Sequence, residues 1–183
     1  MEEFAAAVAS DAQRSDVERD AQVREQLAAH AQEQAQACLR RAPQAPACLY
    51  YQGVALGLQA RAHPLRAGEL LKSMLDSLTA AEAADPGYDK AGPPRVKALV
   101  LLRAPSWPLG PGDVDTGLVE ARRAVQLRPE HPPNQLVLAE ALSKSGDATD
   151  AREAYQRAHD LAQALPTSSD RDDWLKQANQ GLR

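Results

Sequence analysis

The residues of this chain that could perform catalysis or hold a metal are few and scattered. The histidines stand singly, at His30, His63, His131 and His159. None has the His-x-x-x-His spacing that places two ligands on one helix face, and no cysteine pair has zinc-finger spacing. An enzyme would also need a nucleophile beside a base, or paired carboxylates on rigid elements, and no segment offers either. The sequence therefore predicts no catalytic residue, no metal and no cofactor, with the histidines exposed on helices.

The two cysteines, Cys38 and Cys48, lie ten positions apart across a predicted helix turn. A disulfide is feasible at this spacing if the compartment is oxidising. The alternative is a pair of small buried thiols, which we favour from the sequence because free cysteine commonly behaves as a small hydrophobic residue.

Composition favours closely packed helices. Hydrophobic residues make up 44% of the 183 residues but aromatic residues only 4%, whereas sheets need β-branched and aromatic side chains. The net charge of -4 argues against a nucleic-acid partner, because a phosphate-binding face has to be basic. No run approaches the roughly 20 apolar residues of a membrane-spanning helix. The start, Met1-Glu2-Glu3, lacks the features of a signal peptide, but Met1 could stand where an export signal was removed, so the compartment stays open.

Proline residues mark the boundaries of a series of predicted helices, and no segment predicts a strand. Residues 1–14 are alanine-rich and predict a short helix. Ser15 and Asp16 are good N-cap residues, so one long helix is expected over residues 17–41. Further helices are expected over residues 47–62, 64–84, 94–103, 115–127, 133–145, 148–165 and 169–182.

The strongest signal is an internal repeat, in which an alanine-rich helical segment ends at a proline. Pro43, Pro86 and Pro129 are spaced 43 residues apart. In the last unit Gly117 and Ala151 are 34 residues apart, which is the tetratricopeptide period. Prolines that recur at the same place favour a repeat over the alternative, an irregular helical bundle with coincidental alanines.

Stacked helical hairpins are the fold that this repeat predicts, because one hairpin cannot bury its apolar face alone. We predict an all-α fold: a right-handed superhelix of about three tetratricopeptide-like hairpins plus flanking helices, in a single domain over residues 1–183. The units are expected over residues 17–62, 64–104, 113–145 and 147–183, with a loop over residues 104–113.

The concave side of such a superhelix is its usual binding surface. Aligning the first helix of each unit places a mixture of apolar and charged side chains on that side. The predicted groove residues are Tyr50, Val54, Leu58, Lys97, Leu101, Leu136, Glu140 and Lys144. In the alternative interpretation the N-terminal helix or the last helix covers some or all of them.

The loop over residues 104–113 presents Trp107 from a segment that three prolines and two glycines restrict. A rigid aromatic loop is suited to anchor an interface. The interpretation that we favour from the sequence is that Trp107 instead folds back and caps the seam between repeat units.

Several motifs resemble the T-component family associated with TRAP transporters. They occur in the family's order, and the resemblance covers residues 17–165. The motifs are Cys48–Leu58, Ala91-Gly92-Pro93, Ala104–Pro108 with Gly110 and Gly112-Asp113, and Pro129–Asn134 followed by Leu138–Leu142.

This resemblance implies a periplasmic, usually lipid-anchored helical-repeat protein. Its partner would be the substrate-binding subunit of a tripartite carrier, or a small ligand, and it would be able to self-assemble. The chain departs from the family because it has no lipobox cysteine near its start, so any membrane association would need an anchor that this chain lacks. The alternative function is that of a cytoplasmic adaptor that holds a peptide or protein in its concave groove.

Overall fold

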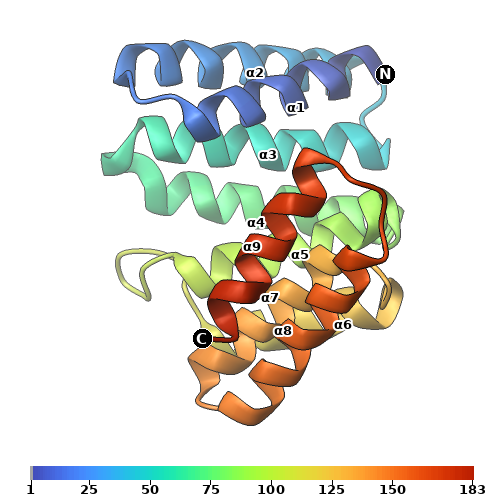
Figure 1. Ribbon diagram of the computed structural model, residues 1–183. Helices are drawn as coiled ribbons and strands as arrows, with labels where there is room; N and C mark the ends of the chain where they lie inside the picture. Colours follow the sequence, from blue (N-terminus) through green and yellow to red (C-terminus); the bar gives the residue numbers. More distant parts are fainter. Residues whose placement is uncertain (1) are drawn as a thin grey trace. The chain divides into compact units, whose positions relative to one another are not determined.

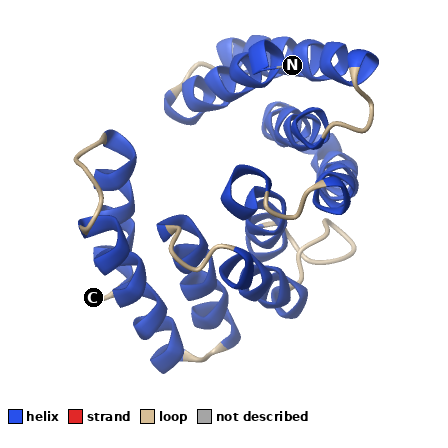
Figure 2. Cartoon of the chain, turned by 90° about the vertical axis from the view of Figure 1, so that its right-hand side faces the viewer, coloured by secondary structure: helices blue, strands red, loops and turns tan. Residues whose placement is uncertain are grey.

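The computed structural model describes residues 2–183, and its regular elements in this range are all helices (Figures 1 and 2). None of them combines the length and apolar character that a membrane crossing requires. A short 3₁₀ helix, η1, covers Pro64–Arg66. The α-helices are α1 (Glu2–Val17), α2 (Ala21–Arg41), α3 (Pro46–Ala62), α4 (Ala67–Ala84), α5 (Tyr88–Arg103), α6 (Val114–Leu127), α7 (Pro132–Ser145), α8 (Ala148–Gln163) and α9 (Ser169–Gly181).

The helix predicted over residues 17–41 begins later than the sequence indicated. Helix α1 runs through Ser15 and Asp16 to Val17, so their predicted N-cap role is wrong. The cap is Asp20, whose side chain accepts hydrogen bonds from the backbone N–H groups of Gln22 at 2.8 Å and Val23 at 3.3 Å. These contacts satisfy N–H groups that have no partner within a helix, and they fix the start of α2.

Helix α5 opens with a turn of the opposite hand. Residues Asp89–Ala91 have φ values of 47°, 55° and 66°. This left-handed conformation costs an L-residue roughly 1–2 kcal/mol. The right-handed part follows, with Pro93 and Pro94 in its first turn, where a missing N–H is tolerated. The prolines therefore marked the start of the right-handed helix, as predicted, but nothing in the sequence indicated the left-handed turn before it.

The described chain divides into two compact units. Unit 1 contains the chain up to Tyr88 together with Pro105–Pro111, and unit 2 contains Asp89–Ala104 and Gly112–Arg183. The prediction of one repeat domain over residues 1–183 stays a prediction.

In unit 1, helices α1 to α4 pack in chain order, and α1 also contacts α3 (Figure 1). Small residues allow this close packing, as Gly53 shows: a Cβ there would lie 3.0 Å from the Leu78 side chain. The loop segment belongs to this unit, since a Cβ on Gly68 would lie 2.9 Å from the Leu109 carbonyl oxygen. A core joining α1, α2 and α3 is formed by Val8, Ala28, Ala31, Ala35, Ala55 and Leu58.

A disulfide joins Cys38, near the end of α2, to Cys48, in the first turn of α3, with an S–S distance of 2.02 Å. The free-thiol interpretation is therefore wrong. The turn between the helices reverses the chain and brings the two Cα atoms to 5.3 Å, which suits a bridge.

Removing this bridge is expected to destabilise unit 1. The double variant Cys38→Ala/Cys48→Ala should lose about 2–3 kcal/mol in free energy of unfolding, because the bridge closes a short loop in the unfolded chain. Urea denaturation followed by circular dichroism measures this loss. Reductant should lower the stability of the wild type similarly and leave the double variant unchanged; equal stability of both proteins without reductant would contradict the prediction.

In unit 2, α6 packs on α7, α7 on α8 and α8 on α9, and α9 also returns to α7. Alanines are most of the buried residues of α6, α8 and α9, and their small side chains let these helices approach their neighbours closely. Helix α7 ends at Gly146, whose φ of 91° is the left-handed conformation that favours glycine at this position. The core between α5, α6 and α7 is formed by Ala98, Leu102, Ala121, Val137 and Ala141.

Candidate functional site

The groove residues predicted on α3 lie in the packing of unit 1. Leu58 and Tyr50 are each 6% exposed. Leu58 and Val54 pack in the core shared with α1 and α2. Helix α1 covers the face of α3 that the alignment of the repeat units assigned to the groove. Tyr50 makes edge-to-face contacts with Tyr51 and Tyr88, at ring-centroid distances of 5.2 and 5.3 Å. The structure therefore does not place these side chains on an open groove.

The two groove residues predicted on α5 are also buried. Lys97 is 7% exposed, and its Nζ lies 2.7 Å from Oε1 of Glu120 on α6. Leu101 is 9% exposed. Arg95, Leu99 and Arg103 each lie two positions along α5 from Lys97 or Leu101. Two positions on a helix correspond to about 200° of rotation, so these three residues lie on the opposite side of α5.

Arg95, Leu99 and Arg103 line a cavity of about 220 Å³ within unit 2, which we call the unit-2 groove. Two predicted groove residues of α7, Leu136 and Glu140, line the same cavity. The structure thus brings these two together with side chains of α5, α8 and α9 that were not predicted from the sequence. The other lining residues are Pro133, Val137, Tyr155, Trp174 and Gln177. Lys144, also predicted on α7, is exposed and does not line the groove.

The rim of the groove contains a charge pair between α5 and α7. The Arg103 guanidinium donates to Glu140 through Nη2 at 2.6 Å and through Nε at 3.0 Å. The bond to Glu140 raises the pKa of Arg103, so the guanidinium stays charged. Burial raises the pKa of the nearby Tyr155 hydroxyl, which keeps it a neutral hydrogen-bonding group. The rim therefore offers fixed charges and polar groups above an apolar floor.

Trp107 does not fold back onto the chain, so the interpretation favoured from the sequence is wrong. Its side chain is 87% exposed, and Leu109 beside it is 77% exposed. The loop is closed by its own backbone, in which the N–H groups of Leu109 and Gly110 both donate to the Ser106 carbonyl oxygen. A Cβ at Gly110 would lie 2.7 Å from the Pro105 carbonyl oxygen, so this turn requires glycine.

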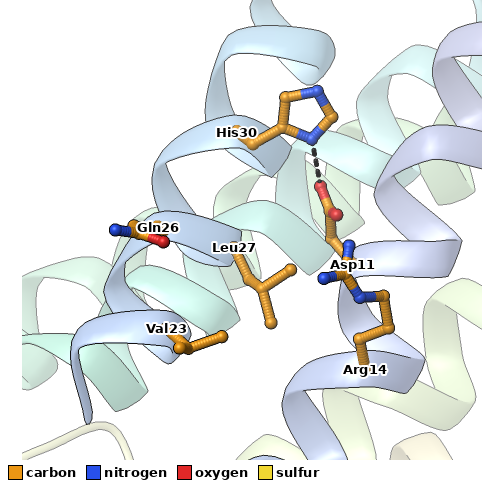
Figure 3. A pocket seen from close by; sticks show the side chains of 6 residues that line it. All are labelled: Asp11, Arg14, Val23, Gln26, Leu27 and His30. Carbon is orange, nitrogen blue, oxygen red and sulfur yellow. Dashed lines mark hydrogen bonds and ion pairs between the residues drawn. The ribbon is translucent and has the colours of Figure 1, made fainter. Parts of the chain in front are cut away.

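A second cavity, of about 330 Å³, lies between α1 and α2 in unit 1 and contains a histidine–carboxylate pair (Figure 3). His30 Nδ1 is 2.6 Å from Oδ2 of Asp11, which is 4% exposed. From the sequence alone His30 is an isolated helix residue, because its partner is 19 residues away on another helix. The remaining lining residues, Arg14, Val23, Gln26 and Leu27, include no nucleophile. The pair therefore contributes to the packing of α1 on α2, and its geometry offers no complete catalytic group.

Within residues 2–183 no three side chains of the kinds that bind metals come together. Comparison with protein-family models and with curated proteins found no match in either case.

Proposed function

We propose that the chain is a non-enzymatic binding protein that holds an extended segment of a partner protein in the unit-2 groove. The observation that carries this proposal is the construction of the groove, with an apolar floor of Leu99, Leu136 and Val137 inside a polar rim. In binding sites of this kind the apolar surface supplies affinity, while a few polar groups fix orientation. Stacking of the hairpins into a tetratricopeptide-like superhelix is part of the proposal, and the sequential packing of α6, α7, α8 and α9 supports it.

The dimensions and residue types of the groove favour a polypeptide over a small molecule. Its volume of about 220 Å³ is below the roughly 300–1,000 Å³ of typical small-molecule sites. It has room for one or two side chains of a bound segment. Arginine, tyrosine and tryptophan carry much of the binding energy at protein interfaces, and Arg103, Tyr155 and Trp174 supply all three here.

The disulfide between Cys38 and Cys48 supports a periplasmic location, because disulfides persist in oxidising compartments and are rare in the cytosol. Together with the resemblance to T-components, this favours the substrate-binding subunit of a tripartite carrier as the partner. The same disulfide disfavours the cytoplasmic adaptor.

Filling the groove is expected to prevent partner binding. Gln177 lines the groove from α9 and is exposed, so Gln177→Trp should occupy the space without disturbing a core. Recovery of the partner from a periplasmic extract of the native host should fall at least about tenfold, as for loss of a central interface contact. Quantitative mass spectrometry of material retained on the immobilised protein measures this.

The matched control is Asn179→Trp, which adds the same side chain to an exposed position on the opposite side of α9 and should retain the partner. Equal loss in both variants, or recovery of cytosolic proteins alone from a whole-cell extract, would contradict the proposal.

A further inference from the structure

A separate cavity in unit 2, of about 360 Å³, lies beside the turn between α6 and α7, and we call it the α7-turn cavity. Its volume falls within the range of small-molecule sites. Residues from three parts of the unit form it: Lys90 from the left-handed turn, Arg128 and His131 from the α6–α7 turn, and Leu165 and Trp174 from the segments after α8. The cavity is therefore built by tertiary packing and not by one helix end.

The walls of this cavity are largely apolar and aromatic. The His131 and Trp174 rings meet edge to face, with centroids 5.6 Å apart and an interplanar angle of 80°. Burial, together with the positive charges of Arg95 and Lys90, lowers the pKa of His131 to about 4. The imidazole is therefore neutral at neutral pH. A flat apolar group in the cavity would contact Leu165 and the uncharged rings of Trp174 and His131, so its binding would not have to displace a charge.

The charged side chains at the cavity have a positive excess, with two cations, Lys90 and Arg128, against one carboxylate, Glu130. The structure records no ion pair for these three side chains within residues 2–183. The Arg128 guanidinium donates to the Leu127 carbonyl oxygen at 2.9 Å, which leaves most of its donors for a ligand. An arginine beside a lysine is well suited to bind a carboxylate.

The backbone that presents Lys90 is held in an unfavourable conformation by specific contacts. Arg95 Nη1 donates to the carbonyl oxygens of Asp89 at 3.2 Å and Lys90 at 3.1 Å. Asn134 Nδ2 donates to the same Lys90 oxygen at 3.1 Å. Left-handed conformations of non-glycine residues persist where the surrounding structure fixes them, and they are concentrated at ligand sites. The contacts thus hold Lys90 at the edge of the cavity despite the strain.

We infer that the α7-turn cavity binds a small organic anion with a flat apolar body, such as an aromatic carboxylate. The carboxylate lies between Lys90 and Arg128, and the ring lies against Trp174 and Leu165. Trp174 also lines the unit-2 groove, but Lys90, Arg128 and Leu165 line this cavity and not the groove, so the inference does not rest on the proposed partner segment.

Fluorescence of Trp174 tests this inference. The chain has two tryptophans, so the exposed Trp107 is first replaced by phenylalanine to leave Trp174 as the reporter. Titration with 3-phenylpropionate should give a saturable change, with a Kd at least about tenfold lower than that of the neutral 3-phenylpropanamide, because only the acid gains charge-assisted hydrogen bonds. Titration with acetate should give no change at the same concentrations, since it lacks the apolar body.

The double variant Lys90→Met/Arg128→Met should bind the acid and the amide with equal affinity. Its matched control, Lys144→Met/Arg152→Met, removes two cations outside the cavity and should keep the preference for the acid. Circular dichroism establishes that each variant is folded. Absence of saturable binding of the acid to the folded reporter protein, equal binding of acid and amide, or a preference that survives in the Lys90/Arg128 variant would overturn the inference.

Discussion

Replacing Asn134 with alanine is expected to lower the free energy of unfolding of unit 2 by about 4 kcal/mol. Asn134 is fully buried. Its Nδ2 donates to the carbonyl oxygens of Arg128 at 2.9 Å, and of Ala124 and Lys90 at 3.1 Å. Its Oδ1 accepts from Arg95 Nη1 at 3.2 Å. Alanine would remove these four hydrogen bonds from a fully buried position, and each such bond contributes roughly 0.5–1.5 kcal/mol.

Urea denaturation of Asn134→Ala measures this loss. Asn134→Asp provides a second measurement, because aspartate has nearly the same shape but its ionised carboxylate cannot donate to the three carbonyl oxygens. It should be at least as destabilising as alanine. The exposed residue Asn179 is the control, and its alanine variant should stay within about 0.5 kcal/mol of the wild type. A stable Asn134→Asp protein would show that the side chain fills space and that its hydrogen bonds contribute little.

Replacing Lys97 with alanine is expected to cost about 3–5 kcal/mol, the usual effect of removing one partner of a buried ion pair. The side chains of Lys97 and Glu120 are 9% and 17% exposed. Oε2 of Glu120 is buried and has no hydrogen-bond partner within the described residues, so the carboxylate depends strongly on Lys97. The variant would leave that charge buried between α5 and α6.

A double-mutant cycle with Lys97→Ala and Glu120→Ala isolates the pair, and its coupling energy in urea denaturation should exceed about 1 kcal/mol. The comparison pair is Arg61 with Asp16, whose side chains are 48% and 64% exposed. Its coupling should stay below about 1 kcal/mol because water screens exposed charges. Similar coupling energies for the two pairs would contradict the role assigned to Lys97.

The helices could be predicted largely from prolines, alanines and capping residues, because these act within a few positions along the chain. Gly146 and Pro132 mark ends of α7 through local backbone preferences. The break between α1 and α2 was predicted too early along the chain, because Ser15 and Asp20 are both suitable caps and only tertiary packing selects between them. Ser15 is buried in α1, which removes it from the cap position.

The candidate site could be predicted only in part, because its residues come from helices whose rotation the sequence does not specify. Leu136 and Glu140 of α7 were identified, but the prediction for α5 was displaced by two residues. On that helix Lys97 and Leu101 were predicted to line the groove because they combine a charged and an apolar side chain, but both are buried. Arg103 was missed because its partner Glu140 is 37 residues away. Pairing at this distance along the chain leaves no periodic signal.

Because the two units are interleaved along the chain, the order in which they are completed during synthesis differs from that of consecutive domains. Unit 1 takes its last segment, Pro105–Pro111, from beyond α5, which belongs to unit 2. A nascent chain therefore completes α1 to α4 and then α5 before the ribosome supplies the segment whose Leu109 carbonyl packs against Gly68. Domains commonly fold as units from the N-terminus during translation, but here the first unit is finished only after the second has begun. Neither unit can be excised, duplicated or exchanged by a single cut in the gene.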